Sequence, residues 1–77
     1  MQERPLSEIA AAIRKDWADV NYAAAPYLDA MDTLDSINDN YFQDTAKSVV
    51  AYFLCNAEGW GGAAAKEIKL ELNGLIK

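Results

Sequence analysis

The sequence predicts an all-α fold, a small bundle of about four short helices that forms a single domain over residues 1–77. Apolar residues recur at steps of three and four along several segments, which is typical of helices with one buried face. Proline, glycine and clusters of Asn, Asp and Ser separate these segments, as expected of short connections. The one short apolar run that could form a strand has no second strand to pair with.

The first helix is expected at about residues 7–19, with Ser7 as its N-cap and Glu8 in the first turn, where the helix dipole favours an acidic side chain. Arg14 and Lys15 lie near its other end, which favours basic side chains. The apolar residues form one stripe: Leu6, Ile9, Ile13, Trp17 and Val20.

A second helix is expected to begin at Pro26, because proline suits the first turn of a helix, and to end between Asp35 and Tyr41. A break is expected around residues 37–43, followed by a third helix capped by Asp44 or Thr45. Its apolar residues follow the helical period: Ala46, Val49, Val50, Phe53, Leu54 and Ala57. Cys55 is expected to be a small buried residue of this helix.

The fourth helix is expected from about Gly62 to Leu75, after a loop at 58–62 that contains Trp60. Leu70 falls off the inward stripe, so it is expected either to be an exposed contact residue or to cover a neighbouring loop. Two interpretations are open for Trp60. It either folds back as a lid over the core or stays half exposed as an anchor for a protein partner.

The charge of −5 is concentrated in one stretch, residues 16–46, which holds seven aspartates and neither lysine nor arginine. Each flank carries a charge of +1. Such a surface repels nucleic-acid backbones and anionic lipid and attracts basic protein surfaces. The sequence therefore argues against direct binding of nucleic acid or membranes, and favours a protein partner.

The residues needed for common catalytic and metal chemistry are scarce in this chain. Histidine is absent and Cys55 is the single cysteine, so neither an imidazole base nor a structural zinc site can form. Asp32 begins no EF-hand, because Leu34 and Ile37 stand where that motif needs an oxygen ligand and a glycine. We predict no enzyme activity, no catalytic or metal-binding residues and no cofactor.

The sequence contains no apolar run as long as a membrane span and no segment that resembles a signal peptide. A cytoplasmic location is therefore expected.

Two sharper hypotheses accompany simple protein binding. In the first, Asp29, Asp32, Asp35 and Asp39 form an outward stripe that imitates DNA phosphates and inhibits a nucleic-acid-binding defence protein. In the second, Asp35–Ile37 resembles the Asp-Ser-Leu attachment site of acyl carrier proteins, which implies a phosphopantetheine group on Ser36. The simplest interpretation of the aspartates, without a specific partner, is a solvated face that keeps the protein soluble.

A longer resemblance covers most of the chain, through segments such as residues 13–17 (I-R-K-D-W), 26–31 (P-Y-L-D-A-M) and 34–39 (L-D-S-I-N-D). The chain resembles a family of small uncharacterised helical proteins encoded in bacterial, phage and mobile-element genomes. This resemblance implies one autonomous domain and transfers no functional residues.

The sequence as a whole predicts a non-enzymatic acidic protein that acts by binding an unidentified protein partner, with a basic surface if the aspartates are the contact. The candidate contact residues are Asp29, Asp32, Asp35, Asp39 and Trp60. Self-association fits equally well. A large exposed side chain at Tyr22, Tyr41 or Trp60 would favour either binding of a protein partner or self-association.

Overall fold

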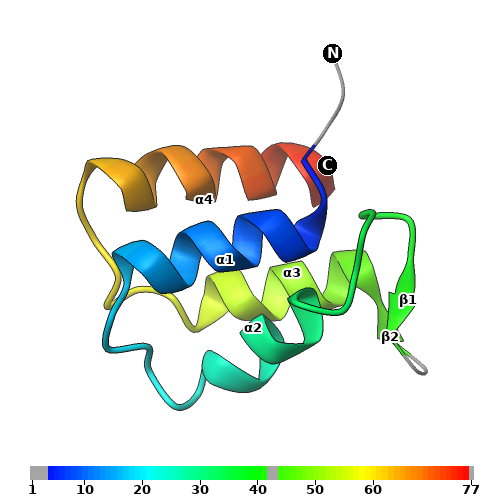
Figure 1. The fold of residues 1–77 in the computed structure, drawn as a ribbon, viewed down its shortest axis with the longest axis horizontal. Coiled ribbons are helices and arrows are strands. Elements are labelled where there is room, and N and C mark those ends of the chain that lie inside the picture. Colours follow the sequence, from blue (N-terminus) through cyan, green and yellow to red (C-terminus); the bar gives the residue numbers. More distant parts are fainter. Residues whose placement is uncertain (1–3, 42–43, 77) are drawn as a thin grey trace.

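In Figure 1 the first, third and fourth helices of the chain lie nearly along the same direction, and the short second helix lies obliquely below them. The computed structural model describes residues 4–41 and 44–76. The helices are α1 (Leu6–Asp16), α2 (Ala25–Met31), α3 (Ala46–Cys55) and α4 (Ala63–Ile76). This arrangement confirms the predicted all-α bundle.

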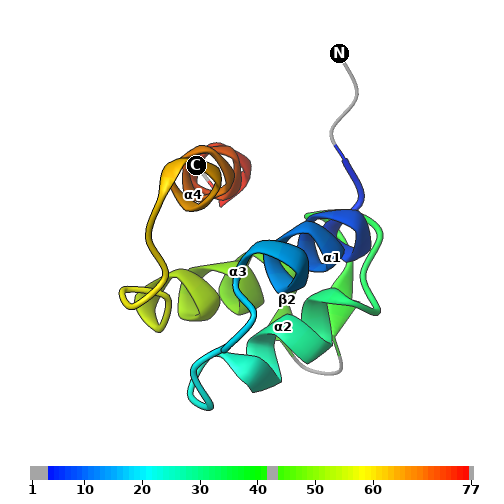
Figure 2. The same ribbon diagram turned by 60° about the vertical axis from the view of Figure 1, so that its left-hand side comes forward.

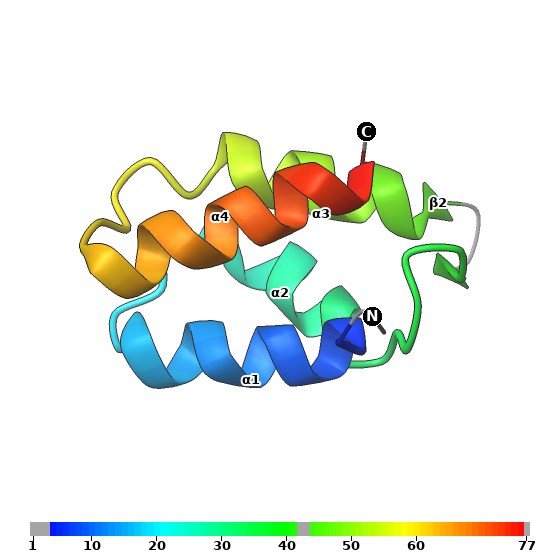
Figure 3. The same ribbon diagram turned by 90° about the horizontal axis from the view of Figure 1, so that it is seen from above.

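Each of α1 and α3 packs against both α2 and α4. α4 runs in the direction opposite to α1 and α3, and from above it lies between them (Figure 3). Seen from the side, α4 and α2 lie on opposite sides of the pair formed by α1 and α3 (Figure 2). The four helices thus enclose a single hydrophobic core, and in the described residues every buried side chain is hydrophobic.

A short β-hairpin is an element that the sequence did not predict. β1 (Asn40–Tyr41) and β2 (Asp44–Thr45) are antiparallel, with Asn40 opposite Thr45 and Tyr41 opposite Asp44. The backbone N–H of Ala46 also donates to the carbonyl of Asp39, at 2.9 Å. The hairpin therefore delivers the chain directly to the start of α3.

The first turn of α1 is closed by backbone contacts and not by Ser7, so the predicted cap is wrong. Pro5 is the N-cap residue, and no side chain caps the helix. The backbone N–H groups of Leu6 and Ser7 instead donate to the carbonyls of Asp35 and Leu34, at 3.2 and 2.9 Å. α1 also ends before residue 19, because Trp17 leaves helical geometry and its side chain is buried in the core.

α2 begins with Pro26 in its first turn, as predicted, but it ends at Met31, earlier than expected. The Thr33 hydroxyl donates to the carbonyl of Ala30 at 2.8 Å, and the chain continues in turns. Leu34 and Ile37 are then buried in the core. Residues 32–39 are thus an irregular segment that is held to the core by its two apolar side chains.

α3 is capped by Thr45, as predicted, since the Thr45 hydroxyl accepts from the backbone N–H of Ser48 at 3.1 Å. The prediction of a buried Cys55 is wrong, because the thiol is exposed. Cys55 lies three residues after the exposed Tyr52, a spacing that places both on the outer side of the helix.

α4 follows Gly62, whose φ of 107° lies in the left-handed region that side chains disfavour. The carbonyl of Gly62 accepts the N–H of Lys66 at 3.0 Å, so this glycine turns the chain into the first turn of α4. The predicted limits of the helix, 62 and 75, agree with the observed Ala63–Ile76 to within one residue.

Three aromatic side chains meet at the centre of the core. The rings of Trp17 and Trp60 are stacked, with centroids 5.7 Å apart and planes within 7°. Phe53 packs edge-on against both rings, at 6.3 Å from Trp17 and 6.4 Å from Trp60. These residues come from the end of α1, from α3 and from the loop before α4, so the cluster ties three segments together.

We expect the Phe53→Ala variant to lose about 3–5 kcal/mol of the free energy of unfolding, because it removes a fully buried ring from this cluster. Phe53→Leu keeps most of the volume and should lose about 1.5 kcal/mol or less. Urea unfolding followed by circular dichroism measures both. Tyr22→Ala is the control and should stay within about 0.5 kcal/mol of wild type, since Tyr22 is 89% exposed. Equal losses for Phe53→Ala and Tyr22→Ala would contradict this core.

Candidate functional site

Two of the predicted aspartates are held by one arginine. The Arg14 guanidinium donates to Asp29 at 2.5 Å and to Asp32 at 2.8 and 3.2 Å. Hydrogen bonds to Asp29, and then to Asp32, raise the pKa of Arg14 above its ordinary value, so the guanidinium remains charged at any working pH. A positive charge thus lies between two of the carboxylates that were expected to face solvent as an unbroken acidic stripe.

The other two predicted aspartates, Asp35 and Asp39, lie on the irregular segment after α2. The Asp39 carboxylate accepts the backbone N–H groups of Asp35 and Ser36, both at 3.1 Å. Asp39 therefore closes a local turn, which is a common structural role for aspartate. The four aspartates do not share one helical face, because only Asp29 belongs to α2.

Ser36 does not open a helix, which is the geometry that the carrier-protein hypothesis requires. It lies in the same irregular segment, and its hydroxyl accepts the backbone N–H of Asn38 at 3.1 Å. Residues 37 and 38 form a turn, and the next regular element is β1. Ser36 thus acts as a turn residue.

Trp60 is 2% exposed. Of the two interpretations that the sequence left open, a lid over the core and a half-exposed anchor, the structure shows the lid. Its indole N–H donates to the Asp16 carboxylate at 2.8 Å, and its carbonyl accepts from the Lys69 ammonium at 2.6 Å. The Lys69 nitrogen also lies 5.7 Å from the centroid of the indole ring. Trp60 is therefore not an exposed anchor, but it holds the loop that precedes α4.

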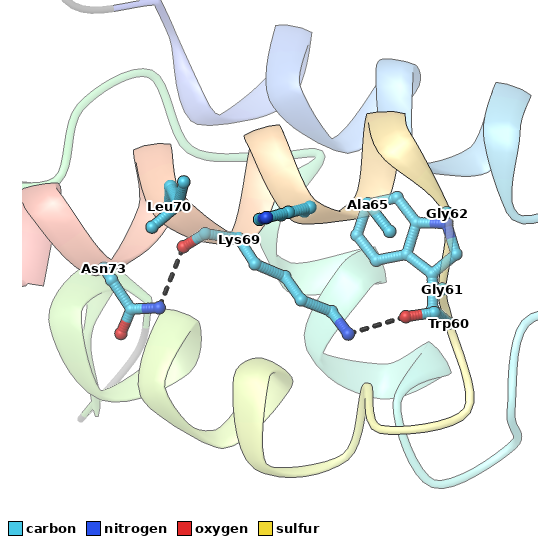
Figure 4. A pocket seen from close by; sticks show the side chains of 8 residues that line it. Trp60, Gly61, Gly62, Ala65, Lys69, Leu70 and Asn73 are labelled. Carbon is cyan, nitrogen blue, oxygen red and sulfur yellow. Dashed lines mark hydrogen bonds between the residues drawn. The ribbon is translucent and has the colours of Figure 1, made fainter.

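A shallow groove of about 420 Å³ runs along α4 next to Trp60 (Figure 4). Of the described residues that line it, two are lysines and none is acidic. Leu70 borders the groove and is 65% exposed, so the off-stripe leucine is an exposed side chain and not a cover for a loop. The lining residues are Trp60, Gly61, Gly62, Ala65, Lys66, Lys69, Leu70 and Asn73.

Leu70 is one of three exposed large hydrophobic side chains in the described residues; the others are Tyr22 and Tyr52. Tyr52 packs against Tyr27, with ring centroids 5.5 Å apart, so part of its ring is covered. Tyr22 is exposed, as one prediction allowed, but it does not line the groove. The Tyr41 side chain, the third candidate, lies outside the described residues.

Lys66 and Lys69 fall on the solvent-facing side of the fourth helix by their spacing, and the sequence does not predict the groove that they line. The available signal was the position of Leu70, an apolar residue on the solvent side of an otherwise regular amphipathic helix. The role of Arg14 was also missed, although it is a basic residue close in sequence to a long acidic stretch.

Within residues 4–41 and 44–76, no three side chains of His, Cys, Asp or Glu are placed so that they could hold a metal ion. In the same part of the chain, no helix is long and apolar enough to cross a membrane. No family model, curated protein or solved structure matches this chain.

We expect Arg14→Gln to lower the free energy of unfolding by about 0.5–1 kcal/mol, because the arginine joins α1 to Asp29 and Asp32 in a partly exposed network. The loss should shrink in about 1 M salt, where the Debye length is only ~3 Å. Urea unfolding in low salt and in about 1 M salt measures the loss of stability under each condition. Lys15→Gln, the same charge change one residue away, is the control. Equal losses for the two variants would rule out a specific contribution of Arg14.

The hydrogen bond between Trp60 and Asp16 can be isolated with two variants of Asp16. Asp16→Asn removes a charge that is unfavourable at the end of α1 but keeps an acceptor, whereas Asp16→Ala removes both. We expect the asparagine variant to be more stable than the alanine variant by about 1 kcal/mol. Urea unfolding followed by tryptophan fluorescence tests this, and equal stabilities would argue that the bond contributes nothing.

Proposed function

We propose that this protein is a non-enzymatic interaction module that binds another protein through the groove and the exposed Leu70 on α4. The observation that carries the proposal is the 65% exposure of Leu70 beside a groove that has Ala65 and Trp60 among its lining residues. The same helix buries Ile68 and Leu72, so Leu70 is not required for the inward stripe.

A single exposed apolar side chain is ordinary on a protein surface and needs no explanation by itself. Leu70 differs because it stands at the edge of a hollow that an incoming side chain could fill. Burying a leucine and its contact partner removes apolar surface from water, which is worth about 1.5–3 kcal/mol for one large side chain. Such a site supplies the apolar contact that a small interface needs.

Neither alternative function receives comparable support. A DNA mimic requires carboxylates spaced along one surface, but Arg14 binds Asp29 and Asp32, and Asp39 is used to close a turn. A carrier protein requires a serine at the start of a helix, but Ser36 lies in a turn. The aspartates are better explained as a solvated surface that contributes to solubility.

The proposed setting is the cytoplasm of a bacterium, with a phage or another mobile element as the proposed origin. The exposed thiol of Cys55 suits a reducing compartment, where free cysteines persist. The origin rests on the resemblance of the sequence to small proteins of such genomes.

The test is an affinity pull-down that compares wild type with Leu70→Ser and with Tyr22→Ser. The Tyr22 variant also makes an exposed large side chain small and polar, but at a position outside the groove. We expect a partner that wild type and Tyr22→Ser retain and Leu70→Ser loses, while circular dichroism shows all three folded. Partners that persist with Leu70→Ser would contradict the assignment of this surface.

A further inference from the structure

We propose that the groove on α4 binds an acidic segment of a partner protein, one in which carboxylates flank an apolar side chain. This inference rests on the proposed function and specifies the chemistry of the partner. The apolar side chain would pack against Leu70 at the edge of the groove, and the carboxylates would pair with Lys66 and Lys69.

The charge of the groove is opposite to that of the whole chain. The protein carries −5, yet the groove is lined by two lysines and by no acidic residue among those described. Glu67 and Glu71 of the same helix are both outside the lining, and Glu71 is paired with Arg4 through two hydrogen bonds of 2.6 and 3.0 Å. An acidic ligand is therefore attracted at this site although most of the molecule repels it.

Lys69 is held in place before any ligand arrives. Its ammonium donates to the Trp60 carbonyl at 2.6 Å (Figure 4) and lies 5.7 Å from the centroid of the Trp60 ring. An ammonium group has three donors, and the Trp60 carbonyl uses one of them. The side chain thus loses less conformational freedom when it binds a carboxylate, which favours binding.

The groove also has room for a backbone to approach closely. At Gly61 and Gly62, no heavy atom beyond the glycine and its two chain neighbours lies within 4 Å of the position that a Cβ would occupy. At the other end, the Asn73 amide donates to the Lys69 carbonyl at 2.9 Å, so its oxygen is directed elsewhere and can accept an N–H from a peptide. Polar contacts at Asn73 and Lys69 would then position the peptide, and Leu70 would supply the apolar contact.

The experiment uses three short blocked peptides, each with one central leucine flanked on both sides by glutamate, by glutamine or by lysine. Each is titrated into the isotope-labelled full chain, and amide NMR spectra locate the binding. We expect the glutamate peptide to shift the amides of Gly61, Gly62, Lys69, Leu70 and Asn73, and the lysine peptide to leave them unchanged. The glutamine peptide should bind more weakly than the glutamate peptide.

Three variants separate the charge from the apolar contact. Lys66→Glu should weaken binding of the glutamate peptide by about threefold to tenfold, and more salt should reduce this difference. Lys47→Glu makes the same charge change on α3, outside the groove, and should bind as wild type does. Leu70→Ser should weaken the glutamate and glutamine peptides alike.

The outcomes distinguish the inference from the function on which it rests. If the lysine or glutamine peptide binds the groove as tightly as the glutamate peptide, the acidic partner is excluded while the groove remains an interaction site. If no peptide shifts these amides at a dissociation constant below about 1 mM, the acidic segment is excluded, and the pull-down with Leu70→Ser decides the proposed function separately. Shifts that depend on protein concentration alone would replace the acidic peptide with a second copy of the chain.

Discussion

The stack of Trp60 on Trp17 is the contact on which the position of α4 depends. A loop of seven residues separates α3 from α4, and Trp60 is the large side chain that fixes this loop to the core. The ring packs between groups from α1 and α3, and the carbonyl of the same residue binds Lys69 on α4. Trp60 thereby contributes both to the core, through its ring, and to the groove on α4, through its contact with Lys69.

The chain is too short to bury a large fraction of its surface, so each large side chain matters for stability. Trp17, Phe53 and Trp60 form the centre of the core, while the alanines of α1, α3 and α4 let the helices approach. Leaving Leu70 outside such a core is notable for this reason. An exposed leucine next to a groove is a physical argument for a contact with something else.

Electrostatics divides the surface into two regions of different character. In the acidic stretch, part of the charge is used inside the molecule: Arg14 binds two aspartates, Asp39 closes a turn and Asp16 accepts the Trp60 indole N–H. The groove is lined by two lysines, and Glu71, which lies outside it on the same helix, is paired with Arg4. The acidic region that stands out in the sequence thus has several carboxylates in structural roles, and the less conspicuous groove is the better candidate for binding.

The helices could be predicted because their apolar residues repeat with the helical period and Pro26, Thr45 and Gly62 mark their starts. The ends of α1 and α2 could not, because Trp17, Leu34 and Ile37 leave helical paths to reach a core formed by distant segments. The same limit applies to the candidate site. Leu70 was visible as an exception to the stripe, but the groove depends on Trp60 and Lys69 meeting across nine residues, which periodicity does not reveal.

The most direct test of the central position of Trp60 is the hydrogen exchange of its indole N–H, measured by NMR on the wild-type chain. We expect the Trp60 indole proton to exchange slowly, close to the rate set by global unfolding, because it is hydrogen-bonded to Asp16 and the residue is 2% exposed. Exchange at the rate of a free indole would mean that Trp60 is not the lid of the core. The position of α4, and with it the groove, would then have to be abandoned.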